Sequence, residues 1–267
     1  MPAEPREDLA AWLRELATRG ARDRAGLAVV EGIAPFLQAC AAGERLEAIA
    51  WSEVLLRSST AQKLVRLQRR AGVPTRHLRP EAFRALSRAV RASGVAAVVR
   101  QRWRPLEAVD PRAGSYADAP LWLALERVRS DGNLGTLLRT AEAVGAAGLI
   151  CVGEAVDPYS LAAIRSSMGA LFHLTRVRAS HEALAGWLRR HGALAIAATP
   201  HGERLYCEQP LRAPVVLFLG EERRGLTPEA FACCEARVRL PVLGRGDSLN
   251  VAIAGGVLLY DLLRRLG

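Results

Sequence analysis

Five continuous apolar segments alternate with helical segments in the second half of the chain, and this pattern limits the fold more than any other feature. The apolar segments cover residues 121–125, 149–152, 193–197, 215–219 and 238–240. Helical patterns cover residues 135–144, 160–169, 181–191, 228–233 and 249–266. Strands that are apolar along their whole length are typical of parallel strands buried on both faces. The pattern predicts a doubly wound α/β domain whose ligands gather at the carboxyl ends of the strands.

The first part of the chain predicts a smaller α/β domain. Short apolar strands are expected near residues 27–30, 46–51, 73–78 and 95–99, with helices between them. The periodicity then fails over a stretch that three prolines and a glycine interrupt. We therefore expect a first domain over residues 1–104, a linker over 105–120 and a second domain over 121–267.

Basic residues are concentrated in one part of the first domain. The 267-residue chain has a net charge of +10, and all but Lys63 of its 37 basic residues are arginines. Residues 60–104 contain twelve basic residues and a single acidic one, Glu81. Such an excess repels itself unless a polyanion neutralises it, so we predict a nucleic acid partner. The residues that we expect to contact the nucleic acid are Arg66, Arg69, Arg70, Arg100 and Arg102.

Composition excludes several other classes of protein. No apolar run reaches the roughly 18 residues that a membrane span needs. The first eight residues are polar and contain no signal-peptide core, so we expect a cytoplasmic protein without a membrane partner. The five cysteines form no C-x-x-C pair, and the five histidines show no ligand spacing. We therefore expect neither disulfides nor a metal site.

Three polar clusters follow the predicted strands. Asn133 can cap the helix after the first strand, and Arg139 lies six residues further on. Gly220 lets a ligand approach the backbone, and Glu222 either neutralises Arg139 or contacts a substrate. A third cluster, residues 248–250, precedes the last helix. Three clusters at strand ends suggest one site, although a capped helix with a solvated arginine and an ordinary surface loop remain alternatives.

The usual nucleotide and hydrolase motifs are missing from the sequence. There is no G-x-G-x-x-G after the strands at 121–125 and 215–219, and no P-loop motif. There is also no G-x-S-x-G elbow, and Ser248 has no evident His and Asp partners. Dinucleotide chemistry, P-loop chemistry and serine hydrolysis are therefore disfavoured.

Taken together, the clusters resemble the SpoU (TrmH) family of SPOUT RNA methyltransferases. The family motif N-x-G-x-x-x-R-T-A corresponds to residues 133–141 and G-x-E-x-x-G-L to 220–226, and the third family motif, which begins with proline and ends in S-L-N-V, corresponds to residues 241–251. The chain departs from the family where Glu221 and Arg223 replace smaller residues. The first domain resembles the family's substrate-binding domain through two thin markers, V-E-G at 30–32 and S-G-V-A at 93–96.

The resemblance implies a fold, a cofactor and a reaction. The fold is a parallel α/β domain with a C-terminal trefoil knot, which general folding rules would not suggest. The cofactor is S-adenosylmethionine, and the acceptor is a ribose 2′-hydroxyl of ribosomal RNA or tRNA. By analogy, the residues around the cofactor are Thr199, Gly220, Leu240, Ser248 and Leu249. Those assigned to catalysis are Arg139, Asn133, Glu222, Ser248 and Asn250.

The same resemblance implies a homodimer, for which the apolar last helix offers a face. We expect Arg139 to stabilise the developing alkoxide rather than act as a base, because a guanidinium gives up its proton reluctantly. Asn133 and Ser248 would then orient the ribose. The alternatives are a non-catalytic RNA-binding or ribosome-assembly protein that keeps the fold, and a base methyltransferase, for which no candidate side chain is evident.

Overall fold

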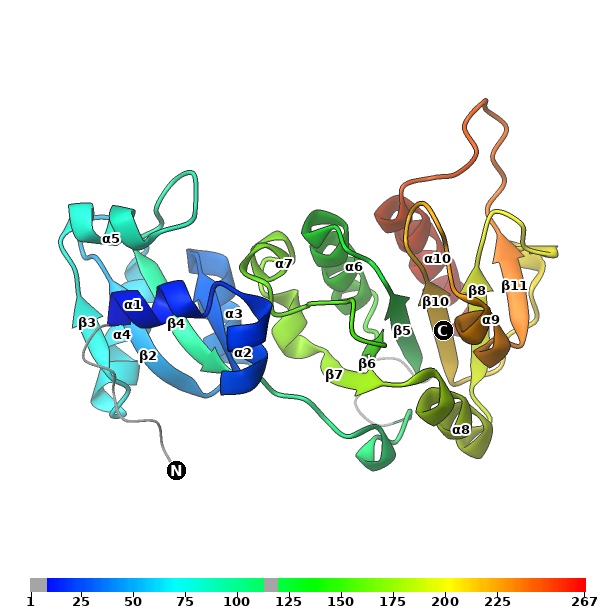
Figure 1. Ribbon diagram of the computed structural model, residues 1–267, viewed down its shortest axis with the longest axis horizontal. Helices are drawn as coiled ribbons and strands as arrows, with labels where there is room; N and C mark the ends of the chain where they lie inside the picture. Colours follow the sequence, from blue (N-terminus) through cyan, green and yellow to red (C-terminus); the bar gives the residue numbers. More distant parts are fainter. Residues whose placement is uncertain (1–8, 113–119) are drawn as a thin grey trace. The chain divides into compact units, whose positions relative to one another are not determined.

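The computed structural model describes residues 9–112 and 120–267, which form two compact units. The first unit contains the described residues up to Arg102 together with Pro158–His173. The second contains the described residues of Trp103–Asp157 together with Leu174–Gly267 (Figure 1). No helix in these ranges is long and apolar enough to cross a membrane.

Two of the expected domain boundaries differ from this division. The segment Pro158–His173, expected in the second domain, packs in the first unit because Leu161 joins its apolar core and the side chain of Tyr159 is fully buried. Part of the expected linker belongs to the second unit, since Leu106 and Val109 are buried in that unit's core. Residues 113–119 of the expected linker lie outside the described ranges.

The first unit is built on a four-stranded sheet in the order β1-β4-β2-β3. β4 runs antiparallel to both β1 and β2, and β3 runs parallel to β2. The strands are β1 (Leu27–Glu31), β2 (Leu46–Trp51), β3 (Thr75–His77) and β4 (Val95–Arg100). The helices are α1 (Leu9–Glu15), α2 (Arg19–Ala25), α3 (Ile33–Ala41), α4 (Ser59–Arg70), α5 (Pro80–Leu86), α7 (Leu161–Ser166) and the 3₁₀ turn η2 (Ala170–His173). Within the described residues, α1 ends at Glu15 and the separate helix α2 begins at Arg19.

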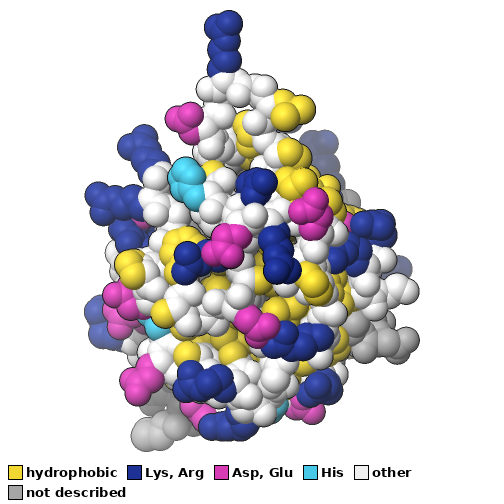
Figure 2. All heavy atoms as spheres, turned by 90° about the vertical axis from the view of Figure 1, so that its right-hand side faces the viewer, with side chains coloured by type: hydrophobic (Ala, Val, Ile, Leu, Met, Phe, Trp, Pro, Cys, Tyr) yellow, Lys and Arg dark blue, Asp and Glu magenta, His cyan; other side chains and the backbone are white. Residues whose placement is uncertain are grey.

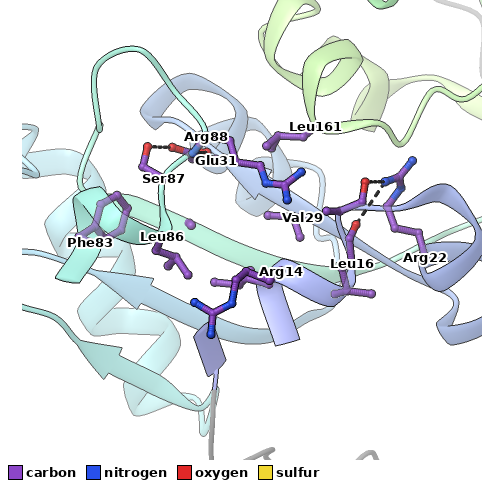
Figure 3. Close-up of a pocket in the computed structure, with 13 residues that line it drawn as sticks. Arg14, Leu16, Arg22, Val29, Glu31, Phe83, Leu86, Ser87, Arg88 and Leu161 are labelled. Atoms are coloured by element: carbon purple, nitrogen blue, oxygen red, sulfur yellow. Dashed lines mark hydrogen bonds between the residues drawn. The ribbon is translucent and has the colours of Figure 1, made fainter. Parts of the chain in front are cut away.

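A buried carboxylate ties the loop after α5 to β1. Glu31 is 3% exposed and accepts hydrogen bonds from the Ser87 hydroxyl and from the backbone N–H of Arg88 at 3.1 Å. A cavity of about 30 Å³ lies beside Glu31, lined also by Phe83 and Leu161 (Figure 3). That volume accommodates only one or two water molecules, so it is not a nucleotide site.

The second unit contains a seven-stranded sheet in the order β7-β6-β5-β10-β8-β11-β9, with every pair parallel. The prediction of a parallel α/β sheet is confirmed. The strands are β5 (Leu121–Glu126), β6 (Gly148–Val152), β7 (Thr175–Ala179), β8 (Leu194–Ala198), β9 (Arg204–Leu205), β10 (Val215–Leu219) and β11 (Ala236–Arg239). The helices are α6 (Asp131–Ala143), α8 (His181–His191), α9 (Pro228–Cys233) and α10 (Val251–Leu266), with 3₁₀ turns η1 (Leu106–Ala108) and η3 (Tyr206–Glu208).

Helices cover both faces of this sheet (Figure 1). On one face α6 packs against α10, and the small Gly255 of α10 lies against the side chains of Leu137 and Leu219. On the other face α8 packs beside α9, and Trp187 of α8 meets Trp122 of β5 edge-on at 5.9 Å between ring centroids. β5 and β10 are buried along their whole length, as the continuous apolar runs predict.

Candidate active site

Three loops that follow strands β8, β10 and β11 line a single cavity of about 530 Å³ in the second unit. The loops are far apart in the sequence, but the three strands are parallel and lie close together in the sheet, so their carboxyl ends meet at one edge. The lining residues fall in the stretches 198–201, 219–226 and 237–251, with Phe231, Ala254 and Leu258 from α9 and α10.

All five residues expected around the cofactor line this cavity. Thr199 follows β8, Gly220 follows β10 and Leu240 follows β11, while Ser248 and Leu249 precede α10. The structure therefore brings these side chains and backbones together. That they bind the cofactor stays a prediction.

Gly220 is required by the chain itself rather than by a ligand. A Cβ atom at this position would lie 2.4 Å from the carbonyl carbon of Gly225 and 2.5 Å from the backbone nitrogen of Leu226. Real Cβ atoms essentially never approach other atoms so closely. The expectation that Gly220 makes room for a ligand is therefore incomplete, because the returning backbone of residues 225–226 already occupies the space next to its Cα.

Residues 221–225 form a tight turn that an ion pair connects to the end of β5. The backbone N–H of Glu221 donates to the Gly225 carbonyl at 3.2 Å, and that of Gly225 donates to the Glu221 carbonyl at 2.8 Å. The Glu221 carboxylate lies 3.2 Å from the guanidinium of Arg127, which directly follows β5. Arg127 holds a φ of 59°, a region that non-glycine residues rarely adopt. This ion pair links two strand ends at the rim of the cavity.

Three of the expected catalytic residues form a chain of hydrogen bonds. The Asn133 amide donates to the Glu222 carboxylate at 2.5 Å, and the Asn250 amide donates to the Asn133 carbonyl oxygen at 3.1 Å. The side-chain oxygen Oδ1 of Asn250 also accepts hydrogen bonds from the backbone N–H groups of Ala252 and Ile253, and these bonds cap α10. One residue from each of the three motifs therefore contributes to one polar cluster, and Glu222 lines the cavity.

Asn133 does not cap its helix, contrary to the expectation. The N-cap of α6 is Ser130, whose hydroxyl accepts a hydrogen bond from the backbone N–H of Asn133 at 3.3 Å. The helix starts at Asp131, earlier than expected, so Asn133 lies in its first turn. This leaves the Asn133 side chain free to meet Glu222 and Asn250.

Arg139 stands apart from the cluster. Its side chain is exposed on α6 in line with Thr136 and Ala143, and it is not among the residues that line the cavity. Six helical residues correspond to roughly 120° around the axis, so Arg139 and Asn133 point in different directions. Within the described residues no hydrogen bond or ion pair engages the Arg139 guanidinium. The expected pairing with Glu222 is absent, since Glu222 binds Asn133 instead.

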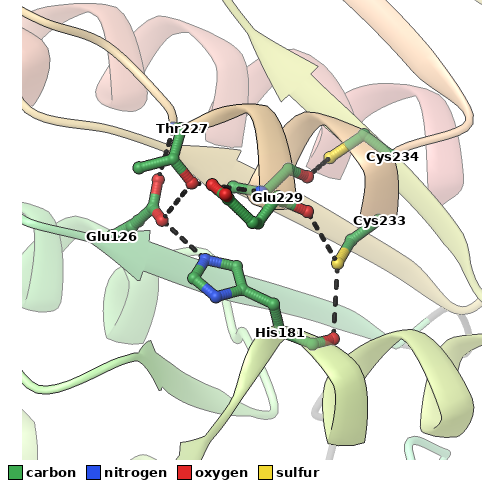
Figure 4. A network of polar contacts seen from close by, with 7 residues as sticks. Glu126, His181, Thr227, Glu229, Cys233 and Cys234 are labelled. Atoms are coloured by element: carbon green, nitrogen blue, oxygen red, sulfur yellow. Dashed lines mark hydrogen bonds and ion pairs between the residues drawn. The ribbon is translucent and has the colours of Figure 1, made fainter.

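Sequence reasoning missed a second polar network, which lies beneath the turn (Figure 4). Glu126, at the end of β5, is 2% exposed and accepts hydrogen bonds from the backbone N–H and the hydroxyl of Thr227, both at 2.8 Å. His181 Nε2 lies 2.6 Å from the same carboxylate. Thr227 caps α9, and the Thr227-Pro228 pair was the available signal for that helix start. The network fixes the exit of the turn to β5 and to the start of α8.

Two neighbouring cysteines border this network without forming a metal site. The Cys233 thiol donates to the backbone carbonyl of His181 at 3.4 Å, and burial raises the pKa of both the Cys233 and Cys234 thiols. In residues 9–112 and 120–267, no group of three or more His, Cys, Asp or Glu side chains could hold a metal ion.

The expected RNA-contacting arginines of the first unit lie on α4 and at the end of β4. Arg66, Arg69 and Arg70 are exposed on α4, where Arg66 also lies 3.3 Å from the Glu53 carboxylate. Arg100 forms an ion pair with Glu47 at 2.8 Å, and Arg102 is exposed two residues beyond it. RNA binding by these five residues stays a prediction.

Comparisons with known proteins match this chain to one family. Residues 120–260 match the model of the SpoU rRNA Methylase family. A 23S rRNA (uridine(2479)-2′-O)-methyltransferase of Streptomyces viridochromogenes is 29% identical over 261 residues, which cover 95% of this chain and 88% of the relative.

Two solved structures share the fold over nearly the whole chain. An AdoMet-bound rRNA methyltransferase from Sinorhizobium meliloti has a TM-score of 0.86 and 30% identity, over 98% of this chain and 96% of that one. The AdoMet complex of the SpoU methyltransferase AviRb from Streptomyces viridochromogenes has a TM-score of 0.80 and 29% identity, over 95% and 96%. With a family match over more than half of its residues, the chain belongs to the SpoU rRNA methylase family.

Proposed function

We propose that this protein transfers a methyl group from S-adenosylmethionine to a ribose 2′-hydroxyl of ribosomal RNA, or of tRNA. The observation that carries the proposal is the convergence at one sheet edge, where Asn133, Glu222 and Asn250 from three motifs are hydrogen-bonded beside a cavity. The printed names of the relatives add the acceptor, since the Streptomyces viridochromogenes relative is named a 2′-O-methyltransferase of 23S rRNA.

The cavity suits the proposed cofactor in size and chemistry. Its volume of about 530 Å³ lies within the range of roughly 300–1,000 Å³ that small-molecule sites occupy. Leu219, Leu226 and Phe231 offer an apolar surface for an adenine ring, and Asp247 offers a carboxylate for the positive amino and sulfonium groups. When bound, the cofactor supplies a methyl group activated by its positively charged sulfur.

The residues beside the cavity would orient the acceptor hydroxyl and stabilise the negative charge that develops on its oxygen. Asn133 and Asn250 hold Glu222 in one place, and Ser248 lines the same wall. A 2′-hydroxyl is a weak acid, so its negative charge must be stabilised as its proton leaves. The guanidinium of Arg139 serves this role better than that of a base, because guanidinium groups give up a proton reluctantly. Preorganised polar groups of this kind lower the barrier because they need no rearrangement during the reaction.

Arg139 would reach a cavity through a second copy of the chain. It is exposed and lies away from the cavity of its own chain. On α10, Ile253, Val257 and Tyr260 are 59%, 42% and 55% exposed and share one face at helical spacing. We propose that this apolar face joins two chains as a homodimer, in which Arg139 of one chain serves the cavity of the other.

Two further parts of the proposal concern the fold and the first unit. The insertion of β10 between β5 and β8, followed by the return of α10 onto α6, is compatible with a C-terminal trefoil knot. The exposed arginines of α4 support a role of the first unit in RNA binding. We also place the protein in the cytoplasm, where its RNA substrates and its free cysteines fit.

Calorimetry with S-adenosylmethionine, followed by methyl transfer from labelled cofactor to ribosomal RNA and tRNA, tests the proposal. Arg139→Ala should bind the cofactor as the unaltered protein does and transfer methyl groups at least 100-fold more slowly. Absence of cofactor binding would favour the non-catalytic RNA-binding alternative. Digestion of the labelled RNA to nucleosides separates ribose from base methylation. Unchanged turnover of Arg139→Ala would reject the assigned role.

A further inference from the structure

Two adjacent arginines stand at the rim of the cavity without a partner in the described chain. Arg223 and Arg224 lie in the turn between β10 and α9, are exposed, and line the cavity mouth. Within residues 9–112 and 120–267, neither guanidinium has a hydrogen bond or an ion pair. Figure 2 shows the side that lies at the right of Figure 1, where basic side chains project among acidic and apolar ones.

The carboxylates of the same turn are already occupied. Glu221 pairs with Arg127 at 3.2 Å, and Glu222 accepts the hydrogen bond from Asn133 at 2.5 Å. Within the described residues, neither carboxylate forms an ion pair with Arg223 or Arg224. The positive charge of Arg223 and Arg224 remains for a ligand that arrives from solvent.

The turn that carries the two arginines is held in place at both ends. Reciprocal backbone hydrogen bonds join Glu221 and Gly225, and the backbone of Gly225 packs directly against Gly220. The Glu126 network fixes the exit of the turn through Thr227. Because the backbone of the turn is already fixed, binding costs little conformational entropy beyond that of the two arginine side chains.

We propose that Arg223 and Arg224 form a phosphate-binding pair that seats the RNA strand at the mouth of the cavity. The inference rests on the proposed function, because it takes RNA as the acceptor. The planar guanidinium matches phosphate oxygens with two parallel hydrogen bonds, and contacts to phosphates position a nucleic acid without reading its sequence. The pair would thus place a ribose beside the cavity, whatever its base.

The double variant Arg223→Gln/Arg224→Gln tests this assignment. In 0.1 M salt its RNA affinity and 1/KM for RNA should fall about 25-fold, because two phosphate contacts contribute about 1.4 to the slope of log K against log salt. The slope itself should become shallower by the same amount. The dissociation constant for S-adenosylmethionine and kcat at saturating RNA should stay unchanged, because the arginines seat the strand and do not touch the reacting atoms.

A matched control exists in the same unit. Arg189 and Arg190 are also adjacent and exposed, and neither forms a described hydrogen bond or ion pair, but they lie in the last turn of α8, five and four residues before β8 begins at Leu194. They therefore lie at the sheet edge opposite the cavity. Arg189→Gln/Arg190→Gln removes the same charge and should leave KM for RNA within about twofold of the unaltered protein.

Several outcomes would overturn the assignment. An unchanged KM and salt slope in the first variant would do so, as would an equal loss in both double variants, which would indicate only a long-range charge effect. A weaker cofactor affinity with unchanged RNA binding would assign the arginines to the cofactor instead. Failure of the unaltered protein to transfer methyl groups would refute the proposed function, whereas RNA binding measured directly would still test the arginine pair.

Discussion

Replacing Gly220 by alanine should disrupt the turn at the rim of the cavity. The new Cβ would lie 2.4 Å from the Gly225 carbonyl carbon, whereas carbon atoms in contact lie about 3.5–4.0 Å apart. The turn must therefore move by roughly 1 Å. The backbone atoms that it meets belong to the closure of the turn, so no flexible side chain can give way.

The size of the effect follows from two contributions. Overpacking costs about 1–3 kcal/mol, and the shift weakens the two hydrogen bonds between Glu221 and Gly225, worth about 0.5–1.5 kcal/mol each. We expect Gly220→Ala to lower the free energy of unfolding of the second unit by about 2–5 kcal/mol. Cofactor affinity should fall as well, because the turn lines the cavity.

Urea unfolding, followed by tryptophan fluorescence and by hydrogen exchange of the second unit, measures this loss. Gly244→Ala is the matched control, since a Cβ at Gly244 meets nothing within 4 Å and its φ needs no glycine. That variant should stay within about 0.5 kcal/mol of the unaltered protein. If Gly220→Ala were equally stable and bound S-adenosylmethionine equally well, the steric account of the turn would be wrong.

Three further predictions follow from individual contacts. Glu126→Gln keeps the size of the side chain but removes the charge from an acceptor of three hydrogen bonds. Hydrogen exchange at the Thr227 amide should therefore accelerate, and the free energy of unfolding should fall by about 1.5–3 kcal/mol. Unchanged exchange would refute the role of the network. Burial raises the pKa of the Cys40 thiol to about 11, so iodoacetamide at pH 8 should label the exposed Cys207 first. Labelling of Cys40 should increase only as the pH approaches 11. Equal labelling of the two cysteines at pH 8 would contradict this prediction. Ile253→Glu should convert the proposed homodimer into a monomer, as measured by light scattering, and should abolish methyl transfer, whereas a stable active dimer would place the interface elsewhere.

The arrangement of the cavity was predictable because it depends on one simple rule. Parallel strands end at the same edge of a sheet, so polar residues that follow β8, β10 and β11 must lie near one another. This is why Thr199, Gly220 and Leu240 line one cavity in the structure. The family resemblance indicated which residues surround the cofactor. The apolar runs predicted the strands that these residues follow, and therefore their position at one edge of the sheet.

Other features depend on tertiary contacts that local patterns do not contain. β7 escaped prediction because Arg176 and Arg178 interrupt its apolar character at the edge of the sheet. The segment Pro158–His173 has an ordinary helical pattern, and it is assigned to the first unit by tertiary contacts such as the close packing of Gly169 against Pro35 and Gln38. Similarly, nothing near Glu126 in the sequence indicates that its partners lie 55 and 101 residues away.

Mass spectrometric mapping of 2′-O-methylated nucleotides tests the central claim most directly. Total RNA from cells that lack this protein would be incubated with S-adenosylmethionine and either the purified protein or its Arg139→Ala variant. We predict a new 2′-O-methyl group at a defined nucleotide of ribosomal RNA or tRNA with the unaltered protein only. A methyl group on a base, or no methyl group in any RNA despite a folded protein, would contradict the assignment.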